Sequence, residues 1–70
     1  MRAIKVFFDE VDTDRLGGIV EKLNDFPDTS AVLCGANEIF ASAVGQCAMQ
    51  YIKSLLEVNF RGAYTIENVK

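Results

Sequence analysis

The first residues of the chain alternate in the manner of a β-strand. Within residues 2–8, one alternate set is apolar (Ile4, Val6 and Phe8) and the other is mixed (Ala3, Lys5 and Phe7). Successive side chains of a strand point to opposite faces of a sheet, so the apolar set is expected to face the core. Residues 30–35, which follow Pro27 and end at Gly35, have the composition of a short, well-buried strand. Residues 63–69 alternate again, and we predict that they form an edge strand.

Residues 12–27 carry the signature of an amphipathic helix. The apolar residues Leu16, Ile19, Val20 and Leu23 follow the i, i+3, i+4, i+7 spacing that places them on one face. Asp12 or Thr13 can cap the start of this helix, because a short polar side chain accepts a hydrogen bond from a free backbone N–H group. Pro27 restricts the backbone of Phe26 and so ends the helix.

A second helix is predicted from Asn37 to about Val58, with Asn37 as its N-cap. Its apolar residues are Ile39, Phe40, Ala43, Val44, Cys47, Ala48, Tyr51, Ile52, Leu55 and Leu56. At 100° per residue they would cover about 220° of the circumference, more than a helix lying on a surface needs. We therefore expect this helix to cover the sheet and, in addition, either the first helix or a second subunit.

In order along the chain, these elements predict an α/β fold. It would be one small domain over residues 1–70, a compact β-α-β-α-β unit with a three-stranded sheet packed with two helices. Half of the 70 residues are apolar. A chain of this size buries only about 60% of its unfolded surface, and such a core seldom suffices alone. We expect a homodimer, formed through the apolar surface of the second helix or through the last strand.

The composition excludes several kinds of chemistry. The chain has no histidine, so histidine-based triads and histidine metal ligands are ruled out. Its two cysteines, Cys34 and Cys47, are too few for a disulfide framework. The predicted second helix would separate them by about 15 Å, beyond the roughly 7 Å reach of a disulfide, so we expect both to be small buried residues. We expect a non-enzymatic protein that holds no cofactor.

The charges of the chain are unevenly distributed. Residues 9–28 hold two basic and seven acidic side chains, a net charge of −5, whereas the rest of the chain has a net charge of +2. The acidic residues are Asp9, Glu10, Asp12, Asp14, Glu21, Asp25 and Asp28. Three of them, Asp14, Glu21 and Asp25, are spaced by seven and four residues and should form one outward stripe on the first helix.

These seven carboxylates have two interpretations. They are either a solvated helix face, with the early acids complementing the helix dipole, or a surface that binds a basic partner. In a two-fold dimer the two segments would carry about −10, the charge of about 17 Å of duplex DNA. The hypothesis that follows is a regulatory protein that binds, and inhibits by charge mimicry, a basic protein such as a nucleic-acid-binding protein.

A divalent-metal or small-molecule site is the alternative, since Asp9, Glu10 and Asp12 follow the carboxyl end of the first strand. A calcium loop is rejected, because it would place Leu16 and Leu23 at positions that require oxygen ligands. A structural subunit of a larger assembly is a third possibility, which predicts an apolar interface that is insensitive to salt.

Direct contact with nucleic acid or membrane is not expected. The turn at Gly35 has one glycine and no lysine, and the seven basic residues are scattered along the chain. No apolar run approaches the roughly 18 residues that would span a bilayer. The start of the chain lacks the apolar core of a signal peptide, so we expect a cytoplasmic location.

Overall fold

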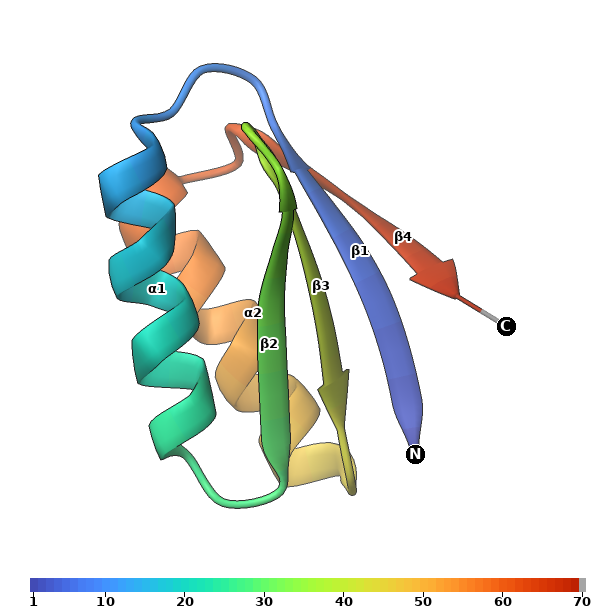
Figure 1. Ribbon diagram of the computed structural model, residues 1–70. Helices are drawn as coiled ribbons and strands as arrows, with labels where there is room; N and C mark the ends of the chain where they lie inside the picture. The colour runs from blue at the N-terminus through green and yellow to red at the C-terminus, as the bar shows by residue number, and fades with distance from the viewer. Residues whose placement is uncertain (70) are drawn as a thin grey trace.

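The computed structural model describes residues 1–69, which form one four-stranded sheet and two helices (Figure 1). The elements, in chain order, are β1 (Arg2–Phe8), α1 (Thr13–Asp25), β2 (Thr29–Gly35), β3 (Glu38–Ala43), α2 (Gln46–Phe60) and β4 (Tyr64–Val69). The small α/β class and the two helices are as predicted. The predicted three-stranded sheet and β-α-β-α-β order are wrong, because an additional strand, β3, follows β2 in the chain before α2 begins.

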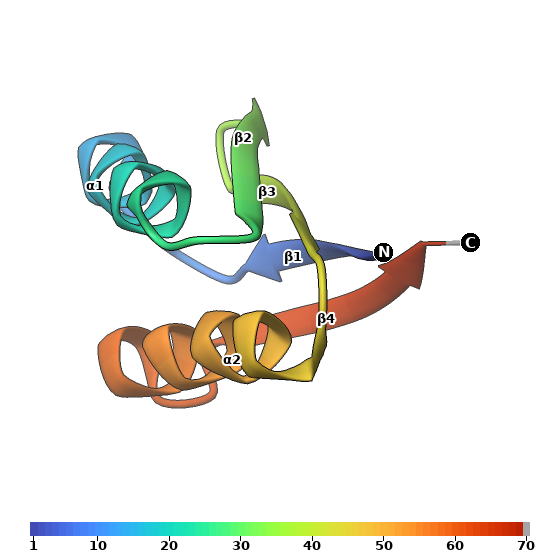
Figure 2. The same ribbon diagram turned by 90° about the horizontal axis from the view of Figure 1, so that it is seen from below.

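The strands are ordered β2-β3-β1-β4, and every neighbouring pair is antiparallel. Each helix therefore connects two strands that have a third strand between them. This order and connectivity define the split β-α-β, or ferredoxin-like, arrangement. Both helices lie on the same side of the sheet, which leaves the opposite side uncovered (Figure 2).

The additional strand, β3, accounts for the error in the second helix. Residues predicted to begin that helix instead alternate, with Ile39, Ala41 and Ala43 buried and the residues between them partly exposed. A strand in the interior of a sheet gains a ladder of hydrogen bonds on both sides, which outweighs local helix propensity. The helix itself begins at Gln46, after Gly45 with a φ of 94°. The apolar arc of about 220° included residues that belong to β3, so α2 does not have the wide apolar surface on which a helix-mediated dimer was predicted.

Asn37, predicted to cap the second helix, instead holds the turn between β2 and β3 against β1. Its backbone carbonyl accepts a hydrogen bond from the N–H of Phe8 at 2.9 Å. Its side-chain amide donates to the carbonyl of Phe8 at 3.0 Å. A residue with strong capping propensity thus stabilises a strand end through the same short polar side chain.

α1 follows the sequence prediction closely. The side chain of Asp12 caps it, Leu16, Ile19 and Leu23 are buried, and Phe26, before Pro27, has left the helix with a ψ of 135°. Beyond this end, the Phe26 ring stacks on Tyr51 of α2 with centroids 3.9 Å apart. This stack joins the two helices at the end of the molecule that holds the α1–β2 connection.

The core lies between the sheet and the helices. Its most completely buried large side chains are Phe8, Ile4, Leu16, Leu23, Ile39, Ile52, Leu56 and Val6. The prediction that Ile4, Val6 and Phe8 form the inner face of the first strand is confirmed, with exposures of 1–2%. Within residues 1–69, no helix has the length and apolar character needed to cross a bilayer.

The predictions of a well-buried second strand and of two buried cysteines are wrong. β2 is an edge strand rather than a well-buried one, and its Val32 side chain is 56% exposed. Cys34, near the end of β2, and Cys47, in the first turn of α2, are both exposed free thiols instead of buried residues. β4 is the other edge, as predicted from the sequence.

Candidate functional site

The seven predicted carboxylates lie along α1 and at both of its ends. Asp9 and Glu10 belong to the β1–α1 connection, Asp12 caps α1, and Asp28 follows it; the remaining three are on the helix itself. All seven residues, Asp9, Glu10, Asp12, Asp14, Glu21, Asp25 and Asp28, are exposed, and together we call them the acidic surface. The predicted outward orientation of the helical stripe is confirmed, because its three residues are exposed whereas the predicted apolar face of α1 holds the buried ones.

Two members of the acidic surface have a clear role in the fold. The carboxylate of Asp12 accepts a hydrogen bond from the backbone N–H of Asp14 at 3.0 Å. Asp14 lies in the first turn of α1, where a negative charge complements the partial positive charge of the helix N-terminus. Capping and the dipole therefore explain these two carboxylates without any partner.

Toward the other end of α1, Glu21 and Asp25 have no comparable explanation. Asp25 is the last residue of the helix, where the partial negative charge of the dipole disfavours a carboxylate. Asp28 has a φ of 64°, a left-handed conformation that Asp adopts more readily than most residues other than glycine, so the turn geometry accounts for an aspartate here. Within residues 1–69, the side chains of Glu21, Asp25 and Asp28 make no hydrogen bond or ion pair that would stabilise the fold.

The two basic residues of this segment do not neutralise it. The guanidinium of Arg15 donates to the carbonyl of Asn59 and lies 4.7 Å from the centroid of the Phe60 ring, so it is directed at α2. Lys22 is exposed. In the part of the chain that the structure describes, the one ion pair joins Lys5 to Glu38 at 3.8 Å, outside the acidic surface. The acidic surface thus keeps an uncompensated negative charge.

Arg15 belongs to an aromatic cluster at the end of the molecule where β1 ends and β4 begins. The ring of Phe60 packs on Phe8 with centroids 4.6 Å apart, and Phe8 in turn lies 6.5 Å from Tyr64. The Tyr64 hydroxyl donates a hydrogen bond to the Glu57 carboxylate at 2.7 Å. This bond, together with desolvation and the negative charge of Glu57, raises the pKa of Tyr64.

The metal-site alternative finds no matching geometry. Asp9, Glu10 and Asp12 are close in sequence, but no three acidic or cysteine side chains among residues 1–69 are grouped so that they could hold a metal ion. A divalent cation such as Ca²⁺ or Mg²⁺ takes six or more oxygen ligands, several of them from the protein in a dedicated site. These carboxylates therefore form part of an extended surface.

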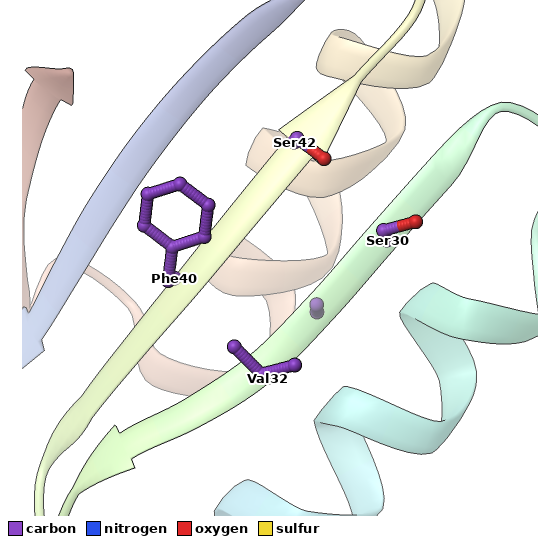
Figure 3. Close-up of a pocket in the computed structure, with 5 residues that line it drawn as sticks. Ser30, Val32, Phe40 and Ser42 are labelled. Carbon is purple, nitrogen blue, oxygen red and sulfur yellow. The ribbon is translucent and has the colours of Figure 1, made fainter.

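The uncovered face of the sheet is a second surface, and sequence reasoning missed it. Figure 3 shows Val32 and Ser30 of β2 beside Phe40 and Ser42 of β3, on the face away from the helices. Together with Ala31 they line a hollow of about 240 Å³. Its lining is mostly apolar and holds no titratable group, so it offers shape and apolar contact rather than acid–base chemistry.

A signal for this face was present in the sequence. Residues 38–43 alternate polar or large residues with buried apolar ones, which is the period of a strand. The alternation was obscured because alanines and an aromatic residue are also compatible with a helix. Placing Phe40 in a helix removed it from the sheet and concealed its pairing with Val32.

Comparisons with protein-family models, with curated proteins and with solved structures find no match to this chain.

Proposed function

We propose that this protein is a non-enzymatic regulatory protein that binds a basic protein partner through its acidic surface. The observation that carries the proposal is the uncompensated charge along α1: seven exposed carboxylates, none of them ion-paired within residues 1–69. Surface charge of one sign steers a partner of the opposite sign and selects against partners of like sign. Asp25 supports a role in binding in particular, because its position disfavours a carboxylate on structural grounds.

The most specific form of this proposal is mimicry of nucleic acid. α1 has 13 residues and is therefore about 20 Å long. Three of the seven carboxylates lie on this helix and four on the segments that flank it, so together they form an extended row of negative charge, as the phosphates of a nucleic-acid strand do. A protein with a groove for a phosphate backbone would meet a row of negative charge on this helix and its flanking segments. Binding there would block the groove and inhibit the partner.

The proposal is tested by neutralising the helical stripe. In the triple variant Asp14→Asn, Glu21→Gln, Asp25→Asn, the net charge of the acidic segment falls from −5 to −2. The matched control, Glu38→Gln, Glu57→Gln, Glu67→Gln, changes the net charge of the whole protein equally but lies outside the acidic surface. Circular dichroism and thermal unfolding verify that both variants are folded.

Tagged protein captures partners from a nucleic-acid-depleted lysate of its own cells, and the affinity of each purified partner is then measured from 50 to 500 mM salt. We expect a basic, nucleic-acid-binding partner whose affinity falls as salt rises and which an oligonucleotide displaces. The stripe variant should bind at least about tenfold more weakly, and the control variant should bind like the wild type. Equal binding by wild type and stripe variant would overturn the proposal. So would a partner whose affinity is insensitive to salt.

A further inference from the structure

The hydrogen-bond directions of β1 show which backbone groups of β4 point away from the sheet. The N–H of Phe8 donates toward the β3 side, to Asn37, whereas the N–H of Asp9 donates to Ala63, on the β4 side. Alternate residues of a strand bond to opposite neighbours, so the odd-numbered residues of β1 bond to β4. The register pairs these with Thr65, Glu67 and Val69. The backbone groups of Tyr64, Ile66 and Asn68 therefore face outward.

The two edges of the sheet differ in how these outward groups are satisfied. On β2, the side-chain amide of Asn24 donates to the carbonyl of Ala31 and accepts from its N–H, both at 2.9 Å. Within residues 1–69, no side chain bonds to the outward backbone groups of Ile66 or Asn68 on β4. An uncapped edge is a template for pairing with another strand.

The distribution of charge also favours pairing at the β4 edge over pairing at the β2 edge. α1 packs beside β2, as the bonds from Asn24 to Ala31 show, and it carries the acidic surface. The strand order places β4 at the far side of the sheet from β2. Two copies joined through β2 would bring together two segments of net charge −5, whereas two copies joined through β4 keep those segments apart.

We propose that the partner of the β4 edge is a second copy of this chain, and that the two β4 strands pair antiparallel about a two-fold axis at Ile66. In this register Tyr64 of each copy lies opposite Asn68 of the other, and about six backbone hydrogen bonds form. The result is a continuous eight-stranded sheet. Pairing also buries additional surface. A domain of only 70 residues usually needs such a contribution, and its two cysteines are free thiols that form no disulfide.

The side chains favour this register over its neighbours. With Ile66 at the axis, Thr65 lies opposite Glu67 of the second copy and can donate its hydroxyl proton to the carboxylate, while Lys5 lies beside Glu67 in its own chain. A shift that placed residue 67 at the axis would put the two Glu67 carboxylates opposite one another, which is repulsive. A shift that placed residue 65 at the axis would leave Asn68 opposite Gly62, which lies outside β4, so the backbone hydrogen bonds of that pair would be lost.

The inference does not depend on the proposed partner-binding function, but it sets the geometry in which that function would operate. Eight strands at about 4.8 Å spacing separate the outer edges by about 34 Å. The two acidic surfaces would lie at opposite ends of the dimer. Each dimer would therefore present two independent copies of the acidic surface rather than one continuous charged rod.

Sedimentation equilibrium from 1 µM to 1 mM provides the first test, with an expected mass of about twice 7.7 kDa at the upper concentrations. The variant Asn68→Pro tests the role of the β4 edge. It removes an outward backbone N–H without removing a hydrogen bond to β1, and a proline is tolerated at such an edge position. We expect its dimer dissociation constant to rise at least about tenfold. Leu33→Pro is the matched change on the β2 edge and should leave the dissociation constant unchanged.

Cross-linking provides a test that does not depend on the folding of a proline variant. In a background with Cys34→Ser and Cys47→Ser, Ile66→Cys should form an intermolecular disulfide on mild oxidation, because the two Cα atoms would lie about 5.5 Å apart. Asn68→Cys should not, because the register separates these residues by about 14 Å along the strands. A monomer at 1 mM would overturn the proposal. Equal cross-linking at both positions, or a dimer weakened by Leu33→Pro instead of Asn68→Pro, would also overturn it.

Discussion

Asn24 and Ala31 form a side-chain imitation of strand pairing at the β2 edge. The Asn24 amide donates to the Ala31 carbonyl and accepts from the Ala31 N–H, each at 2.9 Å, so it takes the place of a neighbouring strand. Native proteins protect sheet edges in several ways, including coverage by a helix. Here a single residue of α1 both anchors the helix to β2 and occupies the outward groups at the middle of an uncharged strand.

Replacing this amide should destabilise the protein. Asn24→Ala removes two partly buried hydrogen bonds, and we expect the free energy of unfolding to fall by about 1–2 kcal/mol in urea titrations. Gln50→Ala, which removes an exposed amide on α2, is the control and should change stability by less than about 0.5 kcal/mol. If both variants unfold at the same urea concentration, the Asn24 bonds contribute nothing.

The stack of Phe26 on Tyr51 should couple the two helices energetically. The rings are nearly parallel, at 8°, with centroids 3.9 Å apart. We expect a double-mutant cycle of Phe26→Ala and Tyr51→Ala, measured by urea unfolding, to give a coupling of about 0.5–1.5 kcal/mol. The same cycle between Phe26→Ala and Val58→Ala, an exposed residue of α2, should give no coupling. Additive effects at Phe26 and Tyr51 would contradict the interpretation.

The bond from Tyr64 to Glu57 should make stability depend on pH in the alkaline range. Its raised pKa means that the folded state holds the phenol proton more tightly than the unfolded state does. The stabilisation is therefore complete below the ordinary value of 10.0 and is lost as the pH rises through the higher folded pKa.

Urea midpoints measured between pH 8 and pH 11.5 test this expectation. Wild-type stability should decline above about pH 10, and both Tyr64→Phe and Glu57→Gln should decline less steeply. Tyr51→Phe is the control for the loss of a phenol elsewhere and should follow the wild type. Parallel curves for wild type and Tyr64→Phe would contradict the assignment.

The C-cap of α2 offers a stabilising substitution. Arg61 adopts a left-handed conformation, with φ 47° and ψ 46°, a position at which glycine is strongly preferred. We expect Arg61→Gly to raise the free energy of unfolding by about 0.5–1 kcal/mol. Lys53→Gly removes the same charge from the exposed interior of α2 and should lower it by about 1 kcal/mol. Thermal unfolding compares the two, and a lower midpoint for Arg61→Gly would refute the expected strain.

Much of the first half of the fold was predictable because its signals are local. The alternation in β1, the Asp12 cap and the restriction by Pro27 each act within a few residues, and the structure confirms all three. The acidic stripe was predictable for the same reason, because helical periodicity alone places Asp14, Glu21 and Asp25 opposite the buried face.

By itself, the sequence determined the α/β class, the limits of α1 and the position of the last edge strand. Only the tertiary structure decided that residues 38–43 pair with two strands instead of extending a helix, because the gain comes from ladders to β1 and β2, which are distant in sequence. It also decided which sheet edge is capped, since the bonds between Asn24 and Ala31 form only when α1 has packed against β2. Local pattern sets what each segment can become, and contacts between segments distant in the chain select among those possibilities.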